Sequence, residues 1–101
     1  MHLLQIEVPV EKIGALCQRR HISRLALFGS VLRDDFRPGS DVDVLVEFEP
    51  GRTPGFAFVS IQEELSALLG DHKVDMVSSK FLKRRIRDQI LKEARLVYEK
   101  E

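Results

Sequence analysis

The stretch LALFGSVLRDDFRPGSDVDVLVEF, residues 25–48, decides how this chain folds. Its first four residues are an uninterrupted apolar run, which predicts a buried strand at about residues 24–28. Gly29 and Ser30 follow that strand and are typical of a turn into a short helix. A Pro-Gly-Ser turn then leads into a second predicted strand at residues 42–48.

Two acidic residues, Asp41 and Asp43, stand where the second predicted strand begins. Side chains alternate between the two faces of a strand, so these carboxylates point to the same side. The valines between and after them point to the other side, toward a core. Two neighbouring carboxylates are costly unless positive charge lies between them, and hard oxygen ligands suit Mg²⁺ or Mn²⁺. The pattern therefore predicts a divalent metal site.

Gly29-Ser30, ten intervening residues and Asp41-Val42-Asp43 together resemble the signature of the DNA polymerase β-like nucleotidyltransferase superfamily. The short chain, with Arg33 soon after the Gly-Ser pair, is most similar to the minimal nucleotidyltransferase (MNT) group. Proteins of that group are antitoxin partners of HEPN-domain toxins. The resemblance covers about residues 13–94, and it implies an α+β fold with a small mixed β-sheet packed with helices.

The resemblance also implies an activity and a set of site residues. The expected reaction transfers AMP from ATP to a hydroxyl, that of a tyrosine, on a partner HEPN toxin. Three acids would be catalytic and would hold two Mg²⁺ ions, with Mn²⁺ as an alternative, and three further residues would bind the nucleotide. The implied acids are Asp41, Asp43 and Asp75, and the implied nucleotide-binding residues are Gly29, Ser30 and Arg33.

Asp75 lies in the middle of a short predicted strand at residues 72–77. The middle of a short apolar strand is an expensive place for a lone carboxylate. The superfamily carries a third acid on this strand, and Asp75 matches its position. The alternative is an acid on the surface of an edge strand, paired with Lys73 or Lys80.

The stretch departs from the common family form at two positions. Val31 stands where many relatives have a second arginine, and Asp34 stands where many have glycine. Neither change removes a metal ligand, so we expect altered affinity rather than lost chemistry. The alternative for Arg33 is a surface ion pair with Asp34 or Asp35.

Length and composition limit the kinds of protein that this chain can be. The chain has 101 residues, which predicts a single domain over residues 1–101. Its formal net charge is zero, so no global field attracts nucleic acid. The one cysteine, Cys17, lies on an apolar helical stripe and is interpreted as a small buried hydrophobe. No apolar run is long enough to span a membrane, so we expect a cytoplasmic protein.

The remaining helices and strands follow from apolar spacing. The helix at 80–94 has a core stripe of Leu82, Ile86 and Ile90, and its other faces are basic. Those faces are either solvated, or a docking surface for an acidic partner or a triphosphate. Residues 1–8 fit either an edge strand or a loose leader. The other predicted elements are helices at 10–20 and 56–69, the latter ended by Gly70, and a terminal strand at 96–98.

Competing functions are weaker. The chain has no P-loop and no Gly-x-Gly-x-x-Gly motif, and an Asp-x-Asp phosphoryl hydrolase would leave Gly29-Ser30 without a role. The main rival is an idle antitoxin that neutralises its partner by binding alone. A nucleotidyltransferase acting on a small molecule or an RNA is a third reading. A homodimer and a hetero-oligomer with the toxin both stay open.

Overall fold

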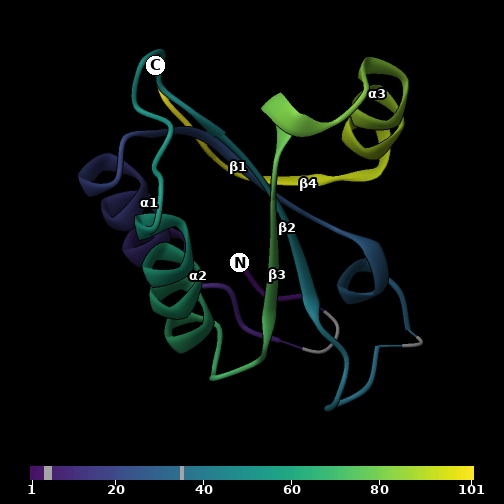
Figure 1. Ribbon diagram of the computed structural model, residues 1–101. Coiled ribbons are helices and arrows are strands. Elements are labelled where there is room, and N and C mark those ends of the chain that lie inside the picture. The colour runs from purple at the N-terminus through teal and green to yellow at the C-terminus, as the bar shows by residue number, and fades with distance from the viewer. Residues whose placement is uncertain (4–5, 35) are drawn as a thin grey trace.

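The computed structural model describes residues 1–3, 6–34 and 36–101, and it shows helices packed around one small sheet (Figure 1). Short 3₁₀ helices, η1 and η2, follow the first and third strands. In chain order the elements are α1 (Val10–Arg19), β1 (Ile22–Phe28), η1 (Gly29–Leu32), β2 (Val42–Phe48), α2 (Ala57–Leu68), β3 (Val74–Ser78), η2 (Ser79–Phe81), α3 (Arg84–Glu93) and β4 (Arg95–Glu99).

The sheet has the strand order β3-β2-β1-β4 and is mixed, as predicted. β1 is antiparallel to both β2 and β4, whereas β2 and β3 run parallel. A parallel pair needs a crossover connection, and α2 provides it here. The bounds of β2 agree with the predicted residues 42–48, and the terminal strand is confirmed as β4.

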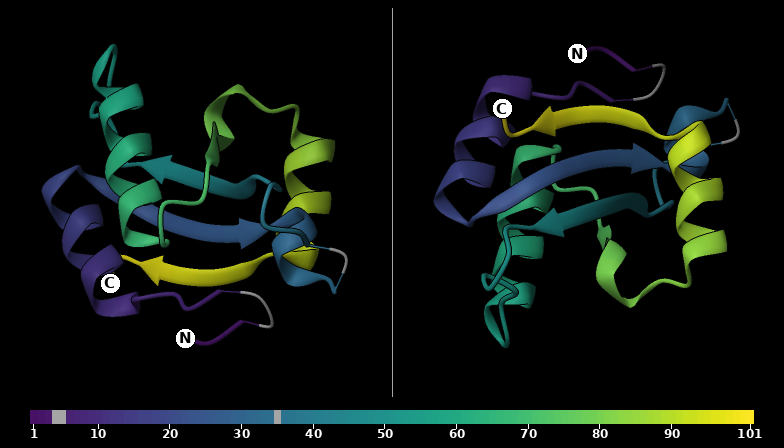
Figure 2. Two further views of the ribbon diagram at one scale, coloured as in Figure 1. Left: turned by 90° about the horizontal axis from the view of Figure 1, so that it is seen from below. Right: turned by 90° about the horizontal axis from the view of Figure 1, so that it is seen from above.

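The two faces of the sheet have different surroundings. Val42, Val44 and Val46 are fully buried on the face that α1 and α2 cover, and they form the core with residues of both helices. α3 lies on the other side of the sheet, as Figure 1 shows. Figure 2 shows that α1 and α2 are neighbours and that α3 stands apart from both. No residue of α3 is buried, whereas Ala26 and Leu45, which are paired on this second face, are buried.

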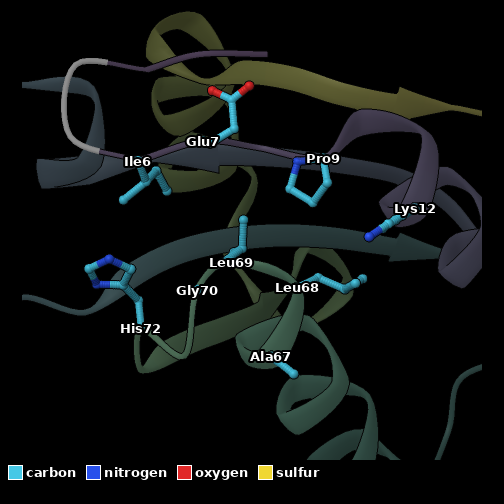
Figure 3. A pocket seen from close by; sticks show the side chains of 9 residues that line it. All are labelled: Ile6, Glu7, Pro9, Lys12, Ala67, Leu68, Leu69, Gly70 and His72. Atoms are coloured by element: carbon cyan, nitrogen blue, oxygen red, sulfur yellow. The ribbon is translucent and has the colours of Figure 1, made fainter.

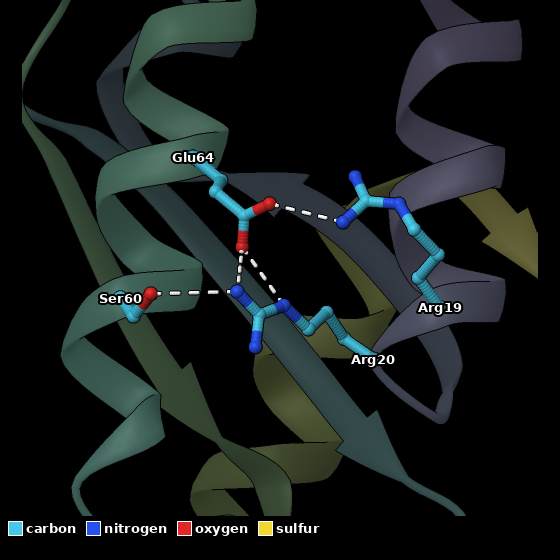
Figure 4. Close-up of polar contacts among 4 residues, drawn as sticks. All are labelled: Arg19, Arg20, Ser60 and Glu64. Carbon is cyan, nitrogen blue, oxygen red and sulfur yellow. Dashed lines mark hydrogen bonds and ion pairs between the residues drawn. The ribbon is translucent and has the colours of Figure 1, made fainter.

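Polar contacts join α1 to α2 at one end of the core (Figure 4). Arg19 donates to one carboxylate oxygen of Glu64 over 3.1 Å, and Arg20 donates to the other through Nε over 2.8 Å. Arg20 also reaches the Ser60 hydroxyl at 3.4 Å. Partial burial acts to raise the pKa of Glu64, but hydrogen bonds from Arg19 and Arg20 outweigh it and lower that pKa. The carboxylate therefore stays ionised and holds the two helices together.

The predicted helix at residues 80–94 is wrong in its first third. Leu82 and Lys83 have extended backbone conformations and separate η2 from α3. The spacing of Leu82, Ile86 and Ile90 fits a helix, but Ile86 is 47% exposed and the stripe does not enter the core. Hydrophobic periodicity predicted a helical segment correctly and its burial wrongly.

The segment after β1 also differs from the prediction. It is a 3₁₀ helix, and Arg33 follows it in an extended conformation instead of lying on one helical turn with Ser30. Elsewhere the differences are small: β1 starts at Ile22, two residues before the predicted start, and β3 ends at Ser78. Gly70 has φ +77°, and the Asp71 N–H donates to the Ser66 carbonyl, so the predicted left-handed end of α2 is confirmed.

For residues 1–8 the sequence fitted either an edge strand or a loose leader. Residues 4–5 of that segment lie outside the described residues. His2 and Glu7 form an isolated antiparallel bridge, and Leu3, Ile6 and Val8 are buried against the core. This packing excludes a loose leader for the described positions.

Two further expectations can be compared with the structure. Cys17 is fully buried, as predicted, and burial raises the pKa of its thiol to about 12, which keeps it protonated and unreactive. Among the described residues, no helix has the length and apolarity that a membrane crossing requires.

The orientation of α2 predicts how substitutions on its two faces affect stability. Leu65 is fully buried whereas Val59, on the same helix, is 57% exposed. Leu65→Ala should lower the free energy of unfolding by about 2–5 kcal/mol, because it leaves a cavity. Val59→Ala, the matched control, should change it by about 0.5 kcal/mol or less. Urea unfolding followed by circular dichroism measures both, and equal losses would contradict the assigned orientation of the helix.

Candidate active site

The parallel register of β2 and β3 brings two of the predicted acids together. Asp43 lies directly opposite Asp75 in that register. Neighbouring strands are about 4.8 Å apart, and residues opposite each other point to the same face. That face is the one away from α1 and α2, because Val42 and Val44 point into the core. Asp41 precedes β2 at the same end of the sheet.

Gly29 lies against the carboxylate of Asp43. Phe28, the last residue of β1, pairs with Asp43, and Gly29 then turns away with φ +78°. A Cβ at position 29 would overlap a carboxylate oxygen of Asp43 and would stand 3.1 Å from its Cγ. Glycine is therefore needed twice at this position, for the backbone conformation and for the space beside the acid.

The three acids repel one another. Partial burial, then the charge of Asp75, then that of Asp41 raise the pKa of Asp43, while the nearby Arg33 guanidinium lowers it less strongly. Asp41, Asp75 and Arg33 therefore all lie within electrostatic reach of Asp43. The site therefore carries negative charge that the protein does not fully balance.

The donor set of the site fits a divalent cation, because its acids supply the hard oxygen ligands that Mg²⁺ and Mn²⁺ prefer. In the described part of the chain, no three His, Cys, Asp or Glu side chains are grouped closely enough to hold an ion as they stand. Binding of an ion by all three acids would therefore require their side chains to move closer together.

Exposure corrects the reasoning about Asp75. The expected cost of a buried carboxylate does not apply, because the side chain is exposed on the edge strand β3. The alternative is therefore right about a surface acid on an edge strand, but among the described residues no ion pair joins Asp75 to Lys73 or Lys80. Its position opposite Asp43 is what supports its place in the candidate site.

The predicted phosphate-binding residues lie at the same end of the sheet. Ser30 is half-buried within η1, and Arg33 is exposed and acts electrostatically on Asp43. The alternative pairing of Arg33 with Asp35 lies outside the described residues. Val31, which replaces a family arginine, is fully buried in the core, so its position is used for packing here.

The acids do not line the cavity that Figure 3 shows. That cavity, of about 490 Å³, lies between the start of α1 and the end of α2, on the core side of the sheet. Its lining includes His72, whose ring is 5.5 Å from that of Phe36, but none of the predicted site residues. Of the three acids, Asp75 is exposed and Asp41 and Asp43 are half-buried.

Sequence reasoning missed one surface. Phe56 and Phe81 are largely exposed beside a second, mostly apolar groove along β3. The available signals were Phe56 directly after a Pro-Gly pair and Phe81 within a basic stretch.

The close approach of Gly29 to Asp43 predicts the outcome of two matched substitutions. Gly29→Ala and Gly51→Ala both force alanine into a left-handed conformation, with φ +78° and +75°, which costs on the order of 1 kcal/mol of stability. Only Gly29→Ala displaces the Asp43 carboxylate, since a Cβ at Gly51 meets nothing within 4 Å. Calorimetry should therefore show weakened Mg²⁺–ATP binding for Gly29→Ala alone. Equal binding by the two variants would contradict the steric role.

The raised pKa of Asp43 predicts how stability depends on pH. The folded state binds the proton more tightly than the unfolded chain, so stability attributable to Asp43 is lost as pH rises from 3.8 through the raised pKa. In EDTA at pH 7, Asp43→Asn should therefore have a higher Tm than the unsubstituted protein. The difference should shrink as pH falls toward 4. A lower Tm for Asp43→Asn at pH 7 would contradict the repulsion.

Comparison with known proteins agrees with this geometry. The family model described as "Polymerase beta, Nucleotidyltransferase" matches residues 11–101. The protein adenylyltransferase MntA of Thermococcus cleftensis is 38% identical over 79 residues, which is 77% of either chain. A solved structure of a protein assigned to the minimal nucleotidyltransferases is 42% identical, with a TM-score of 0.71, over 84% of this chain and 85% of the other.

A third similarity shows the fold alone. The complex of the tri-AMPylated HEPN toxin of Shewanella oneidensis with its MNT antitoxin contains a chain that is 20% identical. Its TM-score is 0.64, over 89% of this chain and 69% of the other. The family match, which covers nearly the whole chain, and the acids that face one another across β2 and β3 lead to one conclusion: the chain belongs to the nucleotidyltransferase family of polymerase β.

Proposed function

We propose that the chain is a protein adenylyltransferase that moves AMP from ATP to a tyrosine hydroxyl of a HEPN-domain toxin and thereby acts as its antitoxin. The single observation that carries the proposal is the register of Asp43 opposite Asp75, with Asp41 beside them. The name of the Thermococcus relative and the AMPylated toxin in the Shewanella complex support the acceptor class. A cytoplasmic location, where ATP is available, is part of the proposal.

The reaction breaks the bond between the α- and β-phosphates of ATP and joins the α-phosphate to the acceptor oxygen. Pyrophosphate leaves, and the acceptor hydroxyl loses its proton. Two Mg²⁺ ions held by Asp41, Asp43 and Asp75 would neutralise the charge that develops on the phosphoryl oxygens. Mn²⁺ has the same preference for oxygen ligands and would serve as a substitute.

The residues of the chain itself have separate tasks in this scheme. Gly29 and Ser30 would hold the β- and γ-phosphates through backbone N–H groups and the Ser30 hydroxyl, and Arg33 would offset their charge. Asp75 is the exposed acid on the edge strand, so it is the one placed to receive the proton of an incoming hydroxyl. The exposure of Asp75 on the edge strand would suit an acceptor as large as a protein.

An idle antitoxin that acts by binding alone is the second candidate. The charge repulsion at Asp43 weighs against it, because a binding module gains nothing from three convergent acids that destabilise its own fold. A nucleotidyltransferase for a small molecule or RNA is the third candidate, and it predicts no labelling of protein.

Labelling with ATP that carries radioactive α-phosphate tests the catalytic assignment. With Mg²⁺ and the HEPN-domain protein of the same genome, Asp43→Asn and Asp41→Asn should each reduce transfer by about a hundredfold or more. The control is Asp71→Asn. Asp71 is exposed and has φ +63°, a conformation that asparagine also tolerates, so this variant should label the acceptor normally.

Separation of the two proteins after the reaction distinguishes the enzyme from the antitoxin that acts by binding alone. A modified toxin stays inactive, whereas recovery of toxin activity and full neutralisation by Asp43→Asn would establish the binding-only reading.

A further inference from the structure

An apolar groove of about 420 Å³ runs along the outer edge of β3, away from the cavity of Figure 3. Phe58 of α2 and Val77 of β3 form part of its lining, together with Pro54 of the preceding loop and Phe81 of η2. We name this surface the aromatic groove. Its lining is mostly apolar, unlike the site that contains the acids.

Two phenylalanine side chains stand in water beside the aromatic groove. Phe81 is 75% exposed, and Phe56, which directly follows the groove residue Gly55, is fully exposed. A buried phenylalanine gains roughly 1.5–3 kcal/mol over an exposed one, so exposing two together is unfavourable in the isolated chain. Grouped exposed apolar side chains of this kind mark interaction surfaces.

The aromatic groove is connected to the acids by a single strand. Val77 and Asp75 are two residues apart and point to the same face of β3, so they are about 6.6 Å apart along the strand. A protein held in the groove therefore has its neighbouring surface beside Asp75. Strand addition to β3 is obstructed in the middle, because the Met76 N–H already donates to the side chain of Gln62 over 3.0 Å. Docking must therefore use side chains.

The surroundings of the groove are basic. Between residues 80 and 87 the chain has five lysine and arginine side chains, of which Arg84 and Arg87 pair with Asp88. Lys80 and Lys83 flank Phe81 closely and form the basic rim of the groove. Two copies of this basic rim would repel each other, so a second copy of the chain is a poor occupant. An acidic protein surface with an apolar ridge complements it in both charge and hydrophobicity.

We propose that the aromatic groove and its basic rim are the docking site for the protein that accepts AMP. The acceptor inserts an apolar ridge between Phe56 and Phe81, acidic side chains of the acceptor face Lys80 and Lys83, and the modified hydroxyl reaches the acids beyond Val77. This inference rests on the proposed function and adds the surface that selects the acceptor. Because the groove is separate from the acids, it acts on acceptor binding and not on the chemical step.

Exposed aromatic and basic side chains also occur in proteins that bind single-stranded RNA. The mostly apolar lining of the groove and the zero net charge of the chain favour a protein partner. RNA binding is therefore an outcome of the test and not the proposal.

The test compares the double variant Phe56→Ser/Phe81→Ser with Leu96→Thr. Leu96 is also exposed, at 45%, but it lies on β4, the opposite edge of the sheet. With the HEPN-domain protein of the same genome immobilised, the double variant should bind about tenfold or more weakly, and Leu96→Thr normally. KM for the acceptor should rise by the same factor, while kcat at saturating acceptor and KM for ATP stay unchanged. Both variants change exposed residues, and their Tm values verify folding.

Reversing the charge of the basic rim distinguishes its contribution to acceptor binding from that of the apolar groove. Lys80→Glu/Lys83→Glu should slow association, and the effect should shrink as salt rises, because exposed charges are screened beyond about 8 Å at physiological ionic strength.

Several outcomes would overturn the docking site. These are normal binding by the double variant, no binding by the unsubstituted chain, a dimer of the chain that the double variant dissociates, or binding of labelled oligouridylate that the double variant loses. The failure of the proposed function looks different. If the acceptor binds through Phe56 and Phe81 but receives no AMP, the docking site stands and the chemistry is wrong. If transfer proceeds with an unchanged KM in the double variant, the chemistry stands and the docking site is wrong.

Discussion

The site of this protein depends on the parallel pairing of β2 with β3. That register alone brings Asp43 and Asp75, which are far apart in sequence, to neighbouring positions on one face. The alternation along β2 then turns Val42 and Val44 into the core and the acid between them away from it. A shift of one residue in this pairing would bury the carboxylate and expose the valines, so the core itself holds the site in place.

The inner face of the sheet carries the packing that stabilises the fold, and the outer face carries the acids of the candidate site. On the inner face, α1 and α2 cover the core and are joined by the contacts of Arg20 with Glu64, where opposite charges meet. On the outer face, partial burial and then the like charges of Asp75 and Asp41 raise the pKa of Asp43, which weakens the fold when its carboxylate is ionised. The acids lie beside β2, whose valines Val42, Val44 and Val46 are fully buried on the opposite face and hold the strand in place.

The sequence predicted well what depends on local pattern. β2 was placed correctly because valine and acid alternate without interruption, and the end of α2 because Gly70 favours a left-handed turn. The break at residues 82–83 could not be predicted, because a helical apolar spacing does not reveal whether a surface exists to receive it. Asp75 was assigned to the candidate site only from the family resemblance. The register between strands that are distant in sequence cannot be predicted from local sequence patterns. The steric role of Gly29 could not be predicted either, because it depends on the contact with Asp43 of another strand.

The central claim is that the carboxylates at the start of β2 hold the ions that act on ATP. Crystals grown with Mn²⁺ and a non-hydrolysable ATP analogue test it directly through the anomalous scattering of manganese. The account predicts an anomalous peak at coordination distance, about 2.1 Å, from carboxylate oxygens of both Asp41 and Asp43, with the analogue's phosphates beside Gly29 and Ser30. A bound analogue whose manganese peak lies away from these carboxylates would contradict the account.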